Sequence, residues 1–217
     1  MTDGKAWRLG SALTCLALLT ACAGGGGTPE TGAPAADETS IVLSDSGVEV
    51  DGQAAPDSAD AAVYVGADIV YYEDGRDETY GEGAEEDAHT AEEAAAHTVV
   101  TITQPGTYRV SGTLSLGQLA VDLGEDAEED PEAVVTLILD GADITCTVAP
   151  AVIFYSVYEC GPGDEESASP TVDTSAAGAN VVLSDGSVNN ITGSYVARIY
   201  KEGTTDKLHK YDGAFYS

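Results

Sequence analysis

A regular alternation of apolar side chains makes residues 134–145 the most clearly patterned stretch of the chain. Valine or leucine occupies every second position up to Leu139, which is the period of a β-strand with one buried face. Asp140 and Gly141 then turn the chain, and Ile144 resumes the apolar pattern. Two structures fit this order of strand, Asp-Gly and strand. One is a hairpin, and the other is the corner of a solenoid coil whose short strands stack on the next coil.

Similar units recur along the chain, each an alternating run closed by an acidic or glycine-containing turn: 48–52, 117–122 and 180–186. This repetition favours the solenoid corner over an isolated hairpin. Because nearly all connections lack helical periodicity, the pattern predicts an all-β chain, either a β-helix or a sandwich. Other short runs with strand character lie at 41–43, 62–65, 68–72, 99–110, 152–155, 195–200 and 208–211.

The segment 73–97 departs from the β pattern and is rich in acidic and turn residues. We interpret it as an insertion, and we expect an acidic, solvated excursion rather than a ligand-contacting loop. Thr90 is followed three positions later by Glu93, which is the spacing of a capping box at the start of a helix. The sequence therefore predicts a short helix that begins after Thr90.

Three sequence motifs follow one another in the second half of the chain: TITQPGTYRVSG at 101–112, GQLAV at 117–121 and LILDGADI at 137–144. In this order they resemble the bacterial carbohydrate-binding, cellulose- and pectin-binding β-helix lipoprotein family. The resemblance runs from about residue 98 to the end. It implies a right-handed parallel β-helix (a solenoid) over residues 41–217, bound calcium ions, and binding of plant-type polysaccharide without catalysis.

The last alternating run, 211–217, ends without a glycine, a proline or a polar capping segment after Tyr216. Solenoids carry caps at both ends, because an open coil exposes unpaired backbone groups and core side chains. We therefore expect further coils beyond Ser217, and we interpret the sequence as a β-helix truncated at its C-terminal end.

The N-terminal segment has the organisation of an export signal. Two basic residues precede an apolar run, 9–19, that is too short to cross a bilayer comfortably. Residues 19–22, Leu-Thr-Ala-Cys, match the cleavage box of bacterial lipoproteins, in which the cysteine is acylated and becomes the new N-terminus. We predict that residues 1–21 are a signal peptide and that Cys22 carries the lipid. The alternative is an ordinary signal peptide with a cysteine by chance.

Residues 22–40 are rich in glycine, proline, alanine, glutamate and threonine, a composition typical of a flexible, disordered tether. A tether behind an acylated cysteine holds a domain away from the membrane, and several acyl chains together give stable anchoring. The sequence therefore predicts a protein that is lipid-anchored to the cell membrane, on its extracellular face.

The chain carries 8 Lys and Arg against 38 Asp and Glu, a formal net charge of −30. Such a charge repels nucleic acid, so a nucleic-acid partner is not expected. Oxygen-rich sites suit calcium. Three aspartates that end predicted strands, Asp122, Asp140 and Asp143, are candidate calcium ligands that stacked coils would bring together. The alternatives are solubility for most carboxylates and ordinary turn chemistry for these three.

Two cysteines remain after the export signal, Cys146 and Cys160. An extracellular compartment permits a disulfide between them, and the sequence leaves open whether they are bonded or free. No Cys-x-x-Cys pair is present and the chain has only 3 His, so a zinc site is not expected.

Tyrosine is the predominant aromatic residue, with 11 Tyr against 2 Phe and 1 Trp. It offers a flat face and a hydroxyl group to a sugar, but it is also an ordinary residue of half-exposed strands. The sequence does not single out which tyrosines form a carbohydrate-binding face. The candidates are Tyr64, Tyr71, Tyr72, Tyr155, Tyr158, Tyr195, Tyr200, Tyr211 and Tyr216.

A β-helix polysaccharide lyase is the enzymatic alternative, with a calcium-bound uronate and a basic residue as the proton acceptor. Each basic residue is also a suitable salt-bridge partner for the many carboxylates, and we expect this to be the main role. No paired-carboxylate spacing stands out, so a glycosidase has no specific support. The candidate bases are Arg76, Arg109, Arg198, Lys201, Lys207 and Lys210.

These observations predict a surface-anchored lipoprotein that binds an extracellular polysaccharide of the pectin or cellulose type, without catalysis and with the help of calcium. A calcium-dependent polysaccharide lyase is the second hypothesis. A structural or adhesive cell-surface protein, whose partner is another protein, is the third.

Overall fold

The computed structural model describes residues 37–160 and 174–217. The predicted signal peptide, the lipidation residue Cys22 and most of the predicted tether lie outside the described residues. The first strand begins at Glu38, three residues before the predicted start at Ile41, so the end of the predicted tether belongs to the folded domain. No helix within the described residues is long and apolar enough to cross a membrane.

The described chain consists almost entirely of short strands and their connections. Among these strands lie the short helix α1 (Ala91–Ala95) and the 3-10 turns η1 (Glu85–Asp87) and η2 (Ala127–Glu129). The strands are β1 (Glu38–Leu43), β2 (Glu49–Val50), β3 (Gln53–Ala54), β4 (Val63–Val65), β5 (Gly81–Glu82), β6 (Thr98–Ile102), β7 (Gly106–Leu114), β8 (Gly117–Asp122), β9 (Val135–Thr145), β10 (Val152–Ser156), β11 (Ala179–Leu183), β12 (Asn190–Thr192), β13 (Val196–Tyr200), β14 (Lys207–Tyr211) and β15 (Phe215–Tyr216).

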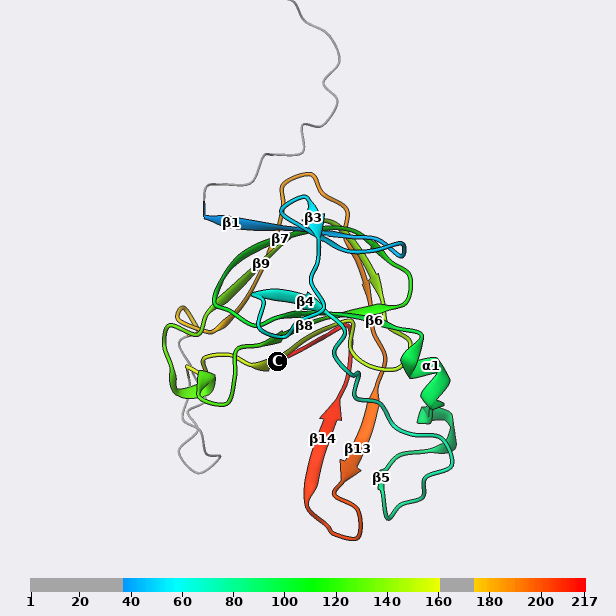
Figure 1. The fold of residues 1–217 in the computed structure, drawn as a ribbon. Helices are drawn as coiled ribbons and strands as arrows, with labels where there is room; N and C mark the ends of the chain where they lie inside the picture. Colours follow the sequence, from blue (N-terminus) through cyan, green and yellow to red (C-terminus); the bar gives the residue numbers. More distant parts are fainter. Residues whose placement is uncertain (1–36, 161–173) are drawn as a thin grey trace, which may run out of the picture. The chain divides into compact units, whose positions relative to one another are not determined.

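Within the described ranges these strands form three sheets (Figure 1). The first has the order β11-β9-β7-β1-β2-β3, with β12 also paired to β9, and the second has the order β15-β10-β8-β6-β4. The central ladders of both sheets are parallel, whereas β2, β3 and β4 are joined to their edges by antiparallel pairing. The third sheet, β14-β13-β5, is antiparallel throughout.

The first and second sheets share one hydrophobic core. From β6 to β10 successive strands alternate between the two sheets. In β9 the side chains of Val135, Leu137 and Leu139 are buried, as the alternation along this strand predicts. They belong to the same core cluster as Leu119 and Val152 of the second sheet. The two sheets therefore pack face to face, as the layers of a sandwich do.

The prediction of a right-handed parallel β-helix is wrong. The described sheets are mixed or antiparallel, and none of them is closed. The apolar alternation located strands and their buried faces, but it contains no information about which strand pairs with which. The resemblance decided between a β-helix and a sandwich, and it favoured the wrong one. The structure is an all-β arrangement of several sheets with sandwich-like packing.

Two Asp-Gly pairs show where the solenoid interpretation failed. Asp51 and Gly52 join β2 to β3 with φ angles of 50° and 74°, which is the left-handed geometry of a two-residue hairpin turn. Asp140 and Gly141 do not reverse the chain, because β9 continues through them. Gly141 has a φ angle of 82°, and the register between β7 and β9 shifts at this point. It therefore forms a β-bulge within one strand, and neither a hairpin nor a coil corner.

The predicted helix after Thr90 is confirmed as α1. The Thr90 hydroxyl oxygen accepts from the Glu93 N–H at 3.1 Å, and the Glu93 carboxylate accepts from the Thr90 N–H at 2.8 Å. His97, just beyond the helix, lies 2.8 Å from the Glu93 carbonyl through Nδ1 and accepts from the Thr147 N–H through Nε2 at 3.1 Å. The segment 73–97 is thus bonded to the sandwich as well as solvated, and its strand β5 pairs with β13.

Candidate functional site

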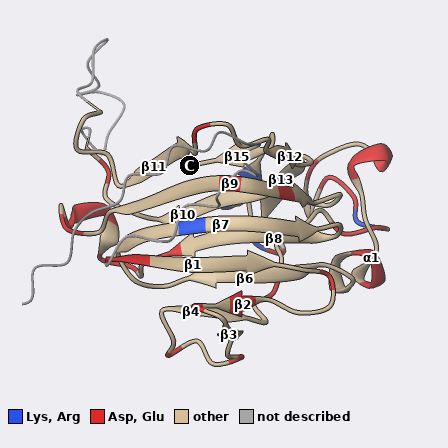
Figure 2. Ribbon diagram, turned by 90° about the horizontal axis from the view of Figure 1, so that it is seen from above, with Lys and Arg blue, Asp and Glu red and all other residues tan. Residues whose placement is uncertain are grey.

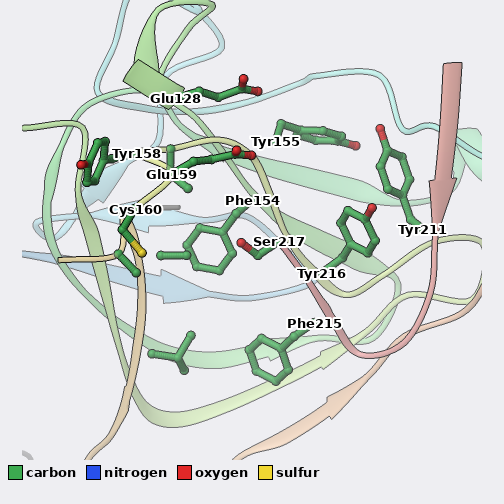
Figure 3. A pocket seen from close by; sticks show the side chains of 15 residues that line it. Glu128, Phe154, Tyr155, Tyr158, Glu159, Cys160, Tyr211, Phe215, Tyr216 and Ser217 are labelled. Carbon is green, nitrogen blue, oxygen red and sulfur yellow. The ribbon is translucent and has the colours of Figure 1, made fainter. Parts of the chain in front are cut away.

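An open pocket of about 720 Å³ lies where β10, β14 and β15 meet the start of β11 (Figure 3). We call it the aromatic pocket, because six of its fifteen lining residues are aromatic. Its aromatic residues are Phe154, Tyr155, Tyr158, Tyr211, Phe215 and Tyr216. Two carboxylates, those of Glu128 and Glu159, line the same pocket.

Strand pairing brings these aromatic residues together from distant parts of the sequence. β15 pairs in parallel with β10, and the register sets Ile153 opposite Tyr216. Side chains alternate across a strand, so Phe154 packs into the core between the sheets while Tyr155 packs with Tyr216 and Ile153 on the other face of the second sheet. The hairpin of β13 and β14 delivers Tyr211 to this same face.

The rings of three tyrosines contact one another edge to face. Tyr155 and Tyr211 have centroids 5.8 Å apart with planes at 79°, and Tyr211 and Tyr216 have centroids 4.8 Å apart with planes at 71°. His209 packs on Tyr211 at 5.5 Å, and its Nδ1 lies 2.7 Å from the Tyr211 hydroxyl oxygen. Edge-to-face pairs are favourable geometries for aromatic rings. The wall of the pocket is therefore held in place before any ligand arrives.

Burial keeps the hydroxyl groups of this wall protonated. It raises the pKa of Tyr155 far above the ordinary tyrosine value, with a smaller contribution from the neighbouring Tyr211. It also raises the pKa of Tyr211 to about 12, with a smaller contribution from Tyr216. Burial lowers the pKa of His209, so its ring is neutral near pH 7. Near neutral pH the wall thus presents uncharged groups that donate and accept hydrogen bonds.

The opposite wall depends on a close approach of backbone segments. The Gly178 N–H donates to the Tyr158 carbonyl at 3.0 Å, and the Tyr158 N–H donates to the Ala133 carbonyl at 2.9 Å. A Cβ atom on Gly178 would lie 2.4 Å from the Tyr158 nitrogen, closer than real Cβ contacts allow. Only glycine fits here without moving the backbone. The Glu159 N–H donates to the Glu128 carbonyl at 3.1 Å, which fixes both acidic residues at the rim.

This arrangement suits a sugar chain. Flat aromatic faces pack against the apolar faces of sugar rings, and tyrosine adds a hydroxyl group at its polar end. The two carboxylates accept hydrogen bonds from hydroxyl groups. A mostly apolar concave site with a few fixed polar groups is the usual form of a small-molecule site. The pocket lining, all of it within the described residues, contains no Lys, Arg or His.

Four of the nine candidate tyrosines line the aromatic pocket: Tyr155, Tyr158, Tyr211 and Tyr216. Tyr72 is instead buried in the core. Sequence reasoning missed the two phenylalanines and the two glutamates of the pocket. Phe154 could have been proposed from the sequence, because it directly precedes the candidate Tyr155 in a predicted strand. Phe215 could not, because no local pattern predicts that β10 pairs with β15.

The three predicted calcium ligands are not gathered into one site. Asp140 and Asp143 lie on β9 of the first sheet, whereas Asp122 lies on β8 of the second. The Asp140 carboxylate accepts from Arg109 at 3.1 Å, and the Asp122 carboxylate accepts from the Gly124 N–H at 3.1 Å, an ordinary turn contact. Among residues 37–160 and 174–217 no group of three or more His, Cys, Asp or Glu could hold a metal ion. The calcium site stays a prediction.

Three of the six candidate bases form ion pairs with carboxylates. Arg109 binds Glu38 and Asp140. The other two pairs join Arg76 to Glu73 at 2.8 Å and Arg198 to Glu82 at 3.6 Å. The remaining candidates, Lys201, Lys207 and Lys210, are exposed on the β13–β14 hairpin.

Both remaining cysteines are free in the described part of the chain. Cys146 is buried, and burial raises the pKa of its thiol. Cys160 is half-buried at the rim of the aromatic pocket. The structure therefore does not contain the disulfide that the sequence left open.

Comparison with known proteins bears on the same region. Residues 96–161 match a family described as carbohydrate-binding domain-containing protein. The matched segment includes β6 to β10 and contributes Phe154, Tyr155 and Tyr158 to the aromatic pocket. No curated protein and no solved structure matches the chain. The family match supports carbohydrate binding.

Proposed function

We propose that this protein binds an extracellular polysaccharide in the aromatic pocket without chemically changing it. The observation that carries the proposal is the pocket itself, which six aromatic residues and two glutamates line. The match of residues 96–161 to a carbohydrate-binding family supports it independently, because it rests on sequence rather than on geometry.

A chain of the cellulose or pectin type fits the chemistry of the lining. Both polymers present ring faces for the tyrosines and phenylalanines, and hydroxyl groups for Glu128 and Glu159. A lyase is the weaker alternative, since none of the described residues that line the pocket is a Lys, Arg or His able to accept the proton.

Binding and turnover are tested together on insoluble cellulose and on polygalacturonate. Tyr158→Ala and Tyr216→Ala each remove an aromatic face of the pocket, and Tyr64→Ala is the matched control because Tyr64 does not line it. We expect each pocket variant to bind roughly tenfold more weakly, about 1.4 kcal/mol, and the control to bind like the wild type. Equal binding by all three variants, or release of unsaturated uronides by the wild type, would contradict the proposal.

We further propose that calcium assists binding by bridging protein carboxylates to the glycan. The support is the net charge of −30 and the preference of calcium for oxygen ligands. Calcium should strengthen binding of polygalacturonate, and a chelator should reverse the effect. Magnesium is the control, because it prefers a smaller and more regular oxygen shell. If both ions act alike, the effect is screening of charge and the specific role of calcium fails.

Anchoring of the protein by a lipid on Cys22 is part of the proposal and rests on the N-terminal sequence alone. Such an anchor places the pocket on the extracellular face of the cell membrane, where polysaccharide is available. Metabolic labelling with a fatty-acid analogue should mark the wild-type protein and leave Cys22→Ser unmarked. Equal labelling of both proteins would remove this part of the proposal and leave glycan binding untouched.

A further inference from the structure

A second hollow, of about 640 Å³, lies on the same hairpin as the aromatic pocket. We call it the hairpin hollow. The β13–β14 turn forms one side of it, and the loop before β5 forms the other. Its lining consists of Glu78, Thr79, Tyr200, Gly203, Thr204, Thr205 and Asp206.

The polar groups of this hollow have hydrogen-bonding capacity left over. No hydrogen bond or ion pair within the described chain engages the carboxylates of Glu78 and Asp206 or the hydroxyl group of Thr205. The hydroxyl groups of Thr79 and Thr204 donate to Asp77 and to the Lys201 carbonyl. Each can still accept a hydrogen bond. The hollow therefore offers acceptors to a ligand that is rich in donors.

One aromatic ring in this hollow is fixed in orientation. The Tyr200 hydroxyl donates to the Glu82 carboxylate at 2.5 Å, and Glu82 also lies 3.6 Å from the Arg198 guanidinium. This bond stabilises the neutral tyrosine, and it raises the pKa of Tyr200. The combination of an immobilised aromatic ring with free carboxylate and hydroxyl oxygens repeats, on a smaller scale, the chemistry of the aromatic pocket.

The hairpin connects the two sites directly. Tyr200 pairs with Lys207 at one end of β14, and Val196 pairs with Tyr211 at the other end. Tyr211 belongs to the aromatic pocket, and Tyr200 belongs to the hairpin hollow. Five residues of extended strand span about 15 Å. One sugar ring cannot reach both sites, but a chain of several sugars that follows the hairpin can.

We propose that the hairpin hollow is a second sugar subsite for the same polysaccharide chain. This inference rests on the proposed function of the aromatic pocket. Sugar hydroxyl groups donate to Glu78 and Asp206, a Thr205 hydroxyl group completes the contact, and the Tyr200 ring supports one sugar face. Simultaneous engagement of two subsites makes the second contact intramolecular, so the affinity for a long chain exceeds the affinity for a short one.

The test compares chain lengths in a variant that disables only the hairpin hollow. Glu78→Ala combined with Asp206→Ala removes both free carboxylates, which are exposed. Glu86→Ala combined with Glu92→Ala is the matched control, because it removes the same charge at exposed positions outside both sites. The probes are cellohexaose and hexagalacturonate with their disaccharides, measured by isothermal titration calorimetry.

We expect the first double variant to bind the hexasaccharide about tenfold more weakly than the wild type does, and to bind the disaccharide with unchanged affinity. The control should match the wild type on both probes. If the wild type binds and the hexasaccharide affinity of the double variant is unchanged, the second subsite is excluded while the proposed function stands. If the wild type binds neither sugar, the proposed function fails and the subsite fails with it.

Discussion

The charged groups around Arg109 already bond to one another, whereas the aromatic pocket is mostly apolar and carries two carboxylates that have no basic partner within the described residues. Arg109 lies on β7 and donates to the Glu38 carboxylate at 2.5 and 3.1 Å and to the Asp140 carboxylate at 3.1 Å. Figure 2 shows how few Lys and Arg segments, in blue, stand among the red Asp and Glu segments of the described chain. The Arg109, Glu38 and Asp140 side chains are only 19%, 6% and 17% exposed. The aromatic pocket has the opposite character, with neutral tyrosines and exposed carboxylates.

The charges of the Arg109 cluster therefore stabilise the fold, whereas the aromatic pocket is a surface that remains free to bind a ligand. Arg109 joins β1, β7 and β9 by contacting a carboxylate on each neighbouring strand. An incoming uronate would have to displace one of these carboxylates. Within the described residues no ion pair engages the pocket carboxylates of Glu128 and Glu159, so a ligand that binds them displaces no basic partner. Charge by itself therefore does not indicate a site in this acidic chain.

The largest effect that we predict on stability comes from Arg109→Ala. The change leaves the Glu38 carboxylate, which is 6% exposed, without its partner. Removal of one member of a buried pair costs about 3 kcal/mol or more, because a desolvated charge is left uncompensated. Urea unfolding should show this loss, while polysaccharide binding by the folded variant should be unchanged.

The same comparison provides a control for that result. Combining Arg109→Met with Glu38→Leu removes Arg109 and its more deeply buried partner together, so that only the Asp140 carboxylate, which is 17% exposed, is left unpaired, and a part of the lost stability should return. A loss just as large in the double variant would mean that side-chain packing, and not unpaired charge, explains the effect. Weaker binding by Arg109→Ala would show that the Arg109 cluster takes part in recognition, which would break the distinction between the two regions.

The converse variant is Phe215→Ala, which should weaken binding more than it weakens the fold. Phe215 is 41% exposed and lies on the edge strand β15. Its truncation should change the free energy of unfolding by less than about 1 kcal/mol, and should reduce polysaccharide affinity roughly tenfold. Leu208→Ala is the matched control, because Leu208 is 52% exposed on β14 and does not line the pocket. Equal losses of binding in both variants would argue against the pocket.

Sequence reasoning located features that depend on near neighbours. The buried face of β9 and the capping box between Thr90 and Glu93 follow from spacings of two and three residues, and both are confirmed. The failures concern long-range pairing. Asp51-Gly52 was assigned to a coil corner and forms a hairpin turn. An Asp-Gly pair fixes local dihedral angles, but it does not determine the strand on which the chain lies next.

Only a part of the aromatic pocket could be predicted from the sequence, because the rest of it also depends on long-range strand pairing. Tyrosine content suggested a carbohydrate-binding face, and four of the nine candidates line the pocket. Its members come from β10 and from the last residues of the chain, more than 50 positions apart, and the parallel pairing of β10 with β15 joins them. The exposed pair Glu128 and Glu159 is fixed by a backbone bond between two loops. No periodicity in the sequence records such contacts.

The effect that is smallest near neutral pH, because it appears only above pH 10, is a loss of stability that originates in the pocket wall. Tyr211 has a pKa of about 12 in the folded protein, against 10.0 for an ordinary tyrosine, chiefly because the ring is buried. Above pH 10 the unfolded chain loses this proton while the folded chain keeps it, so the unfolded state binds fewer protons and stability falls as the pH rises. The contribution is fully present below pH 10 and disappears as the pH passes through about 12.

Tyr211→Phe removes the titrating group and keeps the ring that contacts Tyr155 and Tyr216. The free energy of unfolding should therefore decline less steeply above pH 10 in this variant than in the wild type, with Tyr64→Phe as the matched control. Phenolate absorbance should show a smaller late-titrating component in Tyr211→Phe than in the wild type, because Tyr155 still titrates late in this variant. In the Arg109 cluster the fold stabilises a charged guanidinium, whereas in the pocket wall it stabilises the neutral form of Tyr211. The alkaline titration therefore tests this difference between the two regions. Identical alkaline profiles for the wild type and Tyr211→Phe would mean that the Tyr211 hydroxyl group is open to water, and that the pocket wall is not held in the packed arrangement described above.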